Sequence, residues 1–300
     1  MPKRGLGWTA VILSVLIASF WAYWGACENF HEGWYSVSVL ENLLMLFFQY
    51  LSLTIAFTAL SLIGLKWRLA GLILYLAAGI FCGWFFGGAS FQVVGLLIVI
   101  PFAVLGLLFY FGNPAPKKLA RALIVFVPLV VVVSISIPNL IRASQRMDGD
   151  TSAPSLVEGN GVSLVWAPRG PGWPDRGVSW QEARDICARL SKDGLTVKDQ
   201  DLNIWRLPTA EEAVRSMMLH GENAGGIWHA ESETAEYAKA PDKEAPLWDV
   251  HSKVIYYWTG DTQPSDSGRA YIVVYHGGIF TRTKQSSQAY LSFRAVKAVP

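Results

Sequence analysis

The sequence predicts an α-helical transmembrane bundle over residues 1–146, followed by an α+β domain over residues 161–300 that has two helices and a mainly antiparallel sheet. Long apolar runs fill the first half, whereas the second half alternates short helix and strand patterns. The charges divide in the same way. Residues 1–146 hold nine of the 25 basic residues and three of the 23 acidic residues, so the remainder of the chain holds 16 basic and 20 acidic residues. The turn-rich residues 147–160 between them are typical of a linker.

The first half contains five apolar runs, each long enough for the roughly 18 or more residues that cross a bilayer core. We expect spans at about residues 8–26, 43–65, 69–87, 91–111 and 122–141. Buried helices of a soluble core are the alternative, but short links between five such runs would leave almost no polar surface. The lipid bilayer is therefore an expected partner. No filter, proton relay or pair of broken helices is apparent, so a channel or transporter is not expected.

Lys and Arg residues near the span ends predict the orientation. With the N-terminus in the cytoplasm, seven of them lie on the cytoplasmic side, and two, Arg142 and Arg146, follow the last span. An odd number of spans then places the C-terminal domain outside the cytoplasm, and one miscounted span would reverse this. Glycines in residues 71–87 favour close helix approach, either in a compact bundle alone or with membrane partner subunits or a second copy of the chain.

Two capping boxes predict the two helices of the C-terminal domain. In the pairs Ser179/Glu182 and Thr209/Glu212, the hydroxyl accepts from the backbone N–H three residues on, and the carboxylate reaches back to the N-cap N–H. The expected helices run from Ser179 to about Leu190 and from Thr209 to near Gly221.

The segment that leads into the second helix has an alternating pattern. Pro208 disfavours helical geometry at Leu207, so the chain should be extended there. Trp205 and Leu207 should then point to one side and Arg206 to the other. Two roles remain open for Arg206: it packs in the fold with an ordered guanidinium, or it contacts a ligand.

Strand patterns complete the domain. They are expected at residues 162–167, 254–259, 270–275, 279–283 and 291–296. Residues 222–253 show no sustained periodicity, and a loop this long in a compact domain is usually functional or disordered. Its aromatic content argues against simple disorder.

The motifs GVSWQEARDICARLS and WRLPTAEEA resemble the signature of the formylglycine-generating enzyme (sulfatase-modifying factor) superfamily. The later segment YYWTGDTQPSDSGRAYIVVYHGGIFTRTKQSSQAYLSFRAV narrows the resemblance to the Lcl-type C-terminal domain family of bacterial surface proteins. It covers about residues 161–299, says nothing about the first half, and implies a C-type-lectin-like fold. Because the family is bacterial, we expect the predicted spans to lie in a bacterial cytoplasmic (inner) membrane. The structural signature comprises Ser179, Trp180, Glu182, Trp205, Arg206, Leu207, Pro208, Thr209, Glu212, Trp258 and Arg294.

The resemblance implies a copper-binding cysteine pair in the superfamily's oxidases, and this sequence lacks that pair. Cys187, the one cysteine after the spans, lies on the apolar stripe of a helix, as a buried small hydrophobe would. The histidines of this half have no i, i+3 or i+4 helix spacing, so we expect no metal and no cofactor. The sequence has no basic patch with interleaved aromatics, so we expect no nucleic acid partner.

These observations favour a non-catalytic, membrane-anchored recognition domain in the cell envelope, not an enzyme. Its ligand would be a glycan, a peptide or an envelope protein, held by exposed aromatic and polar side chains. The candidates are Trp228, His229, Trp248, Asp249, His251 and Tyr290. Core packing is the alternative for each aromatic residue. A structural or accessory subunit of a membrane complex and a degenerate formylglycine-generating-type enzyme also remain open.

Overall fold

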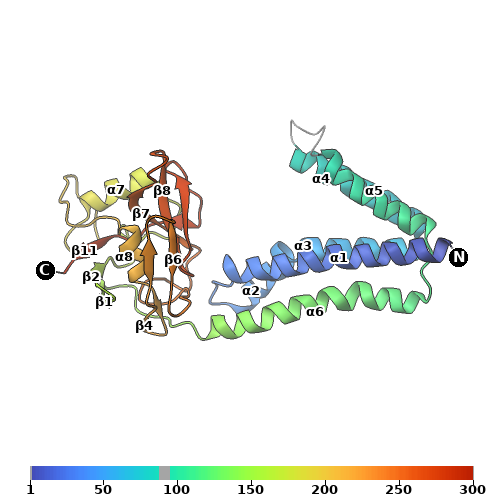
Figure 1. The fold of residues 1–300 in the computed structure, drawn as a ribbon, viewed down its shortest axis with the longest axis horizontal. Helices are drawn as coiled ribbons and strands as arrows, with labels where there is room; N and C mark the ends of the chain where they lie inside the picture. The colour runs from blue at the N-terminus through green and yellow to red at the C-terminus, as the bar shows by residue number, and fades with distance from the viewer. Residues whose placement is uncertain (1, 88–94, 300) are drawn as a thin grey trace. The chain divides into compact units, whose positions relative to one another are not determined.

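The computed structural model describes residues 2–87 and 95–299, and the chain forms two compact units (Figure 1). The helical unit comprises Met1–Trp34 and Ser38–Ile141, and the C-terminal unit comprises Tyr35–Val37 and Arg142–Pro300. Among the described residues, the first unit contains helices and no strand, and the strands belong to the second.

The helical unit is built from consecutive apolar helices. They are α1 (Pro2–His31), α2 (Val39–Met45), the π-helix η1 (Leu46–Tyr50), α3 (Ser52–Lys66), α4 (Arg68–Gly87), α5 (Leu96–Phe111) and α6 (Lys117–Ser144), whose last residues enter the C-terminal unit. Within the described residues, three helices are long and apolar enough to cross a membrane: Lys3–His31, Arg68–Gly87 and Lys117–Ser144. The number rises to four if α2–η1 and α3, which meet at a bend of 58°, count as one span.

These helices confirm apolar candidate spans in the N-terminal half, while the number five stays a prediction. The predicted spans 8–26, 69–87 and 122–141 lie within the three long helices. Residues 91–94 of the predicted span 91–111 lie outside the described residues, and the remainder falls in α5, which has 16 residues. The predicted span 43–65 is broken at Leu51, although we expected no broken helix.

Close helix approach in this unit depends on glycine, as the sequence indicates. A Cβ atom added to Gly71 on α4 would lie 2.3 Å from the Cα atom of Gly64 on α3. One hydrogen bond, 2.8 Å long, joins the hydroxyls of Ser61 and Tyr75 across the same two helices. The ring of Tyr75 stacks on Phe109 of α5, and α4 and α5 run side by side (Figure 1).

The C-terminal unit has short strands in two main sheets, with α7 (Trp180–Arg189) and α8 (Ala210–Arg215) between them in sequence. β1 (Ser155–Gly159), β2 (Val162–Trp166) and β11 (Val296–Ala298) form an antiparallel sheet in the order β1-β2-β11. The second sheet has the order β10-β7-β8-β9, in which only the β10–β7 pair is parallel. Its strands are β7 (Tyr256–Thr262), β8 (Arg269–Val274), β9 (Ile279–Thr283) and β10 (Leu291–Ser292).

Two small hairpins complete the unit. They differ from the prediction for residues 209–253, which were expected to form a helix to near Gly221 and then a long irregular loop. β3 (Met218–Leu219) pairs with β4 (Glu222–Asn223), and β5 (Ile227–His229) pairs with β6 (Thr234–Glu236). The second predicted helix therefore ends at Arg215 and not near Gly221. His220 and Gly221 both have positive φ, 51° and 76°, and such a pair makes a tight hairpin turn that stops a helix.

Two further boundaries differ from the sequence prediction. The predicted linker 147–160 contains β1, because residues 155–159 pair with β2 and extend that sheet. The predicted strand 291–296 is divided between β10 and β11, which belong to different sheets. The chain passes from one sheet to the other through Phe293, Arg294 and Ala295, all fully buried.

Arg294 holds this crossing in place. Its guanidinium is fully buried and donates to the carbonyls of Ala167, Pro246 and Leu247. It also lies over the ring of Trp173, with 3.7 Å from Cζ to the ring centroid. Trp258 is equally buried and donates from Nε1 to the Val178 carbonyl at 2.8 Å. Both signature residues therefore stabilise the core.

Candidate functional site

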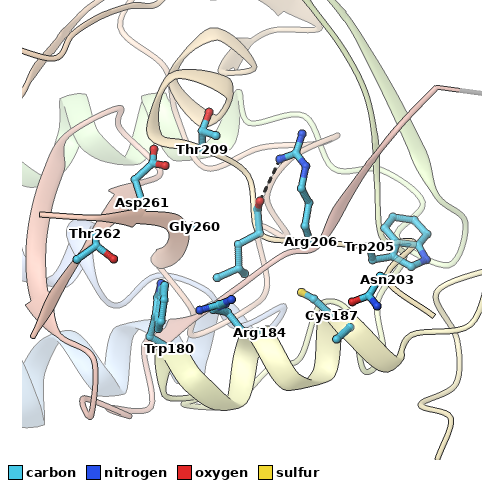
Figure 2. Close-up of a pocket in the computed structure, with 12 residues that line it drawn as sticks. Trp180, Arg184, Cys187, Asn203, Trp205, Arg206, Thr209, Gly260, Asp261 and Thr262 are labelled. Carbon is cyan, nitrogen blue, oxygen red and sulfur yellow. Dashed lines mark hydrogen bonds between the residues drawn. The ribbon is translucent and has the colours of Figure 1, made fainter. Parts of the chain in front are cut away.

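A groove of about 490 Å³ lies in the C-terminal unit between α7, the segment 203–209 and the end of β7 (Figure 2). Side chains from all three line it (Figure 2). The lining residues are Trp180, Arg184, Cys187, Ala188, Asn203, Trp205, Arg206, Leu207, Thr209, Gly260, Asp261 and Thr262.

The segment 203–209 has the alternation that the sequence predicts. Trp205 and Leu207 are buried, and the Trp205 indole N–H donates to the Ser191 carbonyl at 2.8 Å. Arg206 points away from them, and about half of its side chain is exposed. One backbone bridge to Val296 of β11 fixes the segment as an extended chain. This side of the groove is therefore tied to β11, and about half of the Arg206 side chain is exposed to solvent.

The capping box at Thr209 fixes the upper end of the groove. The Thr209 hydroxyl accepts from the Glu212 N–H at 3.0 Å, and the Glu212 carboxylate accepts from the Thr209 N–H at 2.8 Å. The Ser179 box is only half formed. Ser179 caps the helix through the Glu182 N–H, but the Glu182 carboxylate pairs with Arg176 at 2.6 Å instead of reaching back.

Arg206 is held by the same capping carboxylate. Its two terminal nitrogens donate to the two oxygens of Glu212, each at 2.6 Å. The guanidinium also donates to the Leu207 carbonyl at 3.1 Å, the bond that Figure 2 marks with a dashed line. These hydrogen bonds raise the pKa of Arg206 above its ordinary value. Burial raises the pKa of Glu212, but the bonds from Arg206 and Thr209 outweigh it and lower the pKa overall. The pair is a fixed, internally neutral wall.

Asp261 supplies a negative charge on the opposite wall. The strand register of β7 shifts between Trp258 and Thr262, and this irregularity contains Gly260 and Asp261. The Asp261 carboxylate accepts from the Ala210 N–H, at the start of α8, at 2.7 Å. An acidic side chain is stabilised there by the N-terminal end of the helix.

Three polar side chains in the groove have hydrogen-bonding capacity to spare. Arg184 lies over the Trp180 ring, 4.8 Å from its centroid, with Thr262 to one side of it, beyond Trp180, and Asn203 to the other, beyond Cys187 (Figure 2). Among the described residues, no side-chain hydrogen bond is formed by Arg184, Asn203 or Thr262. Together with Asp261 they offer both donors and acceptors to a bound molecule.

Cys187 lies in the groove wall as a buried thiol, where the sequence places it. Burial raises its pKa well above the ordinary value for cysteine, so the thiol stays protonated at neutral pH. A protonated thiol is a poor nucleophile. In the part of the chain that the structure describes, no group of three or more His, Cys, Asp or Glu residues is arranged to hold a metal ion.

The residues that the sequence nominated as ligand contacts do not gather at one place. Trp248 and Asp249 are buried, and Trp248 stacks on Tyr257 in the core with 3.9 Å between ring centroids. Trp248 therefore packs in the core, the alternative that the sequence leaves open for each aromatic residue. Asp249 forms an ion pair with Arg169.

The remaining nominated residues are more accessible but lie apart. Trp228 is half-buried against Tyr271, and Tyr290 is half-buried against Tyr256. His229 is exposed and lies 3.5 Å from Glu236, and His251 is exposed and lies 3.3 Å from Asp148. None of them lines the groove.

The groove itself is made by the signature stretch, which the sequence had singled out mainly for packing. Trp180, Trp205, Arg206, Leu207 and Thr209 all line it. Arg184 and Asp261 were missed, because a charged residue on a helix and another in a strand give no signal until the fold brings them together. No protein-family model, no curated protein and no solved structure matches the chain.

Proposed function

We propose that the protein is a membrane-anchored, non-catalytic recognition protein whose C-terminal unit binds a polar ligand, a glycan or a peptide, in the groove at Arg184. The single observation that carries the proposal is the balanced set of polar groups there. Arg184 and Asp261 carry opposite charges, Asn203 and Thr262 are neutral, and the Arg206–Glu212 pair is neutral as a whole. Such a wall suits hydroxyl and amide groups better than a polyanion.

We propose that five helical spans anchor the protein in a bacterial cytoplasmic membrane. The candidate spans within the helical unit support it, and so does the excess of Lys and Arg on one side of the predicted spans. The C-terminal unit would then face the extracytoplasmic side. The Lcl-type, C-type-lectin-like fold belongs to the same proposal, and the two capped helices followed by a mainly antiparallel sheet support it.

The test is binding of the full-length protein, in lipid nanodiscs, to broad glycan and peptide arrays. We expect specific binding that is at least about tenfold weaker in Arg184→Ala, because a hydrogen bond to a charged group contributes about 1.5–3 kcal/mol. Arg189→Ala is the matched control, since Arg189 lies on the same helix but outside the groove. Absence of binding on both arrays, or equal binding by Arg184→Ala and wild type, would overturn the proposal.

A further inference from the structure

A second cavity, of about 360 Å³, lies within the helical unit at the break between η1 and α3. One wall comes from α1, and the other comes from residues on both sides of the break. The lining residues are Trp21, Trp24, Gly25, Glu28, Glu32, Gln49, Tyr50, Ser52 and Leu53.

The helix break is what opens the cavity. Residues 46–50 form a π-turn, in which the Leu51 N–H bonds to the Leu46 carbonyl at 2.8 Å, and the chain then bends by 58° into α3. Short π-helical segments inside helices often occur at functional sites. In membrane bundles, discontinuous helices frequently border the place where a polar solute binds.

Two carboxylates on α1 face this cavity without a cation of their own. Glu28 and Glu32 are one helical turn apart, both are half-buried, and both line the cavity. Among the described residues, neither forms an ion pair. Like charges at this spacing repel each other. Both residues lie just beyond the predicted span 8–26, and partial burial of a carboxylate is costly unless a partner compensates its charge.

Aromatic rings line the cavity together with these two carboxylates. Trp24 lies one turn and Trp21 two turns before Glu28 on α1, and Tyr50 is the last residue of the π-helical segment. An aromatic face attracts a cation, and several rings around one cation make the usual recognition surface for quaternary ammonium groups. The cavity thus combines rings and carboxylates.

A buried amide behind the cavity lining is a second polar group without a partner among the described residues. Asn29 is fully buried, and neither amide atom has a hydrogen bond to a described residue. A Cβ atom added to Gly33 would lie 3.1 Å from the Asn29 Oδ1 atom and 3.0 Å from the Tyr50 ring. The amide therefore lies next to the ring that lines the cavity. Unsatisfied buried amides are rare and call for an explanation.

We propose that this cavity binds an organic ammonium group, either of a free amine or quaternary amine or of a lipid headgroup. Glu28 and Glu32 balance its charge, and Trp21, Trp24 and Tyr50 surround its alkyl surface. A metal ion fits less well, because the described residues here supply two carboxylates and no third acidic, His or Cys ligand. This site is separate from the groove at Arg184, so either proposal can fail alone.

The experiment uses the full-length protein in nanodiscs of phosphatidylglycerol, which contains no amine, with tetramethylammonium chloride as the probe. Saturation-transfer NMR on the probe's methyl signal measures binding, and sodium chloride keeps the ionic strength constant. We expect saturable binding that is at least about tenfold weaker in Glu28→Gln/Glu32→Gln, since two unit charges are removed from a site of low polarity. Glu41→Gln, an exposed acidic residue outside the cavity, should bind like wild type.

A second variant guards against misfolding of the double substitution. Trp24→Ala removes one half-exposed ring, and it should also weaken binding, whereas Trp24→Phe should retain most of it. Repeating the titration in phosphatidylcholine nanodiscs separates the two sources: competition by the lipid indicates a headgroup, and unchanged binding indicates a free ammonium compound. No saturable binding by wild type, or equal binding by folded Glu28→Gln/Glu32→Gln, would overturn the proposal.

Discussion

The two units bury different kinds of polar residue. In the helical unit, the buried polar residues among those described are neutral: Ser14, Asn29, Asn42, Thr54 and Ser61. In the C-terminal unit they include charged residues, namely Asp242, Lys243, Glu244, Asp249 and Arg294. A buried charge is tolerated only where partners compensate it, and the C-terminal unit supplies them. The helical unit packs around glycine and hydroxyl groups, as helices in a membrane do.

This contrast predicts that the largest loss of stability follows from removing a buried charge of the C-terminal unit. Arg294→Met should lower the free energy of unfolding by about 3–5 kcal/mol, because it leaves three carbonyl acceptors without their donor. Thermal unfolding followed by tryptophan fluorescence measures this. Arg282→Met, an exposed position on β9, is the control and should change stability by less than about 0.5 kcal/mol. Equal effects of the two would contradict the role given to Arg294.

Lys243 makes the same unit sensitive to pH. Burial, followed by the nearby charge of Arg146, lowers the pKa of Lys243 to about 7, although Asp249, Asp175 and Asp242 act in the opposite direction. From pH 7 to 9.5 the unfolded chain holds a proton that the folded chain has lost, so stability should rise with pH by up to roughly 3 kcal/mol. Below about pH 7 both states are protonated and the full penalty remains.

The variant Lys243→Met should abolish this rise. Urea unfolding at several pH values between 7 and 9.5 provides the measurement. The same pH slope in the variant and in wild type would show that another group is responsible. Cys187 acts in the opposite direction above about pH 8.5, because burial raises the pKa of its thiol and only the unfolded thiol ionises, so the comparison with Lys243→Met isolates the contribution of Lys243. Burial also raises the pKa of Tyr271 and Tyr275 to about 12, and their effect begins near pH 10, where an unfolded tyrosine ionises.

In the helical unit, the sensitive positions should be glycines and not charges. Gly71→Ala places a Cβ atom against the backbone of Gly64, which cannot move aside, and should cost about 1–3 kcal/mol. Gly5→Ala meets nothing within 4 Å and should be neutral or stabilising by about 0.5–1 kcal/mol. Thermal unfolding in the same detergent compares them. A loss as large for Gly5→Ala would mean that helix propensity, and not helix contact, sets the effect.

The smallest expected effect is the difference in stability between variants of the two helix N-caps in the C-terminal unit. Thr209→Ala removes a complete capping box and should cost about 1–2 kcal/mol, whereas Ser179→Ala removes half a box and should cost less. Urea unfolding of both variants at one pH gives the difference. A larger loss for Ser179→Ala would contradict the assignment of the two caps.

Local patterns in the sequence predicted local structure well. The structure confirms three features that depend on residues close together in the sequence. They are both N-caps, the alternation of Trp205, Arg206 and Leu207, and the strand at residues 279–283. Early termination of the second helix was missed, because a positive φ at His220 and Gly221 is not evident from side-chain periodicity. The break at Leu51 was missed for a similar reason: the apolar run continues unchanged through it.

The candidate groove was only half predictable. The motifs that contain Arg184 and Asp261 were recognised, but these two residues could not be picked out, because only the fold brings α7 and β7 together beside residues 203–209. Trp248 was nominated because it lies in a long aromatic segment, and the stacking on Tyr257 that buries it requires the folded sheet. Placing such residues depends on tertiary pairing, which periodicity does not encode.

The central claim is that an anchored helical unit presents the Arg184 groove to the outside of the cell. Labelling of Arg184→Cys on intact cells with a membrane-impermeant maleimide tests it most directly, in a chain whose Cys27 and Cys82 are replaced by Ser. Cys187 stays in this chain, and because it is buried, the reagent should label it only if the protein unfolds. A chain that keeps Cys187 alone is therefore the control for unfolding. We predict labelling without permeabilisation. Labelling that occurs only after the membrane is opened would place the groove in the cytoplasm and contradict the account.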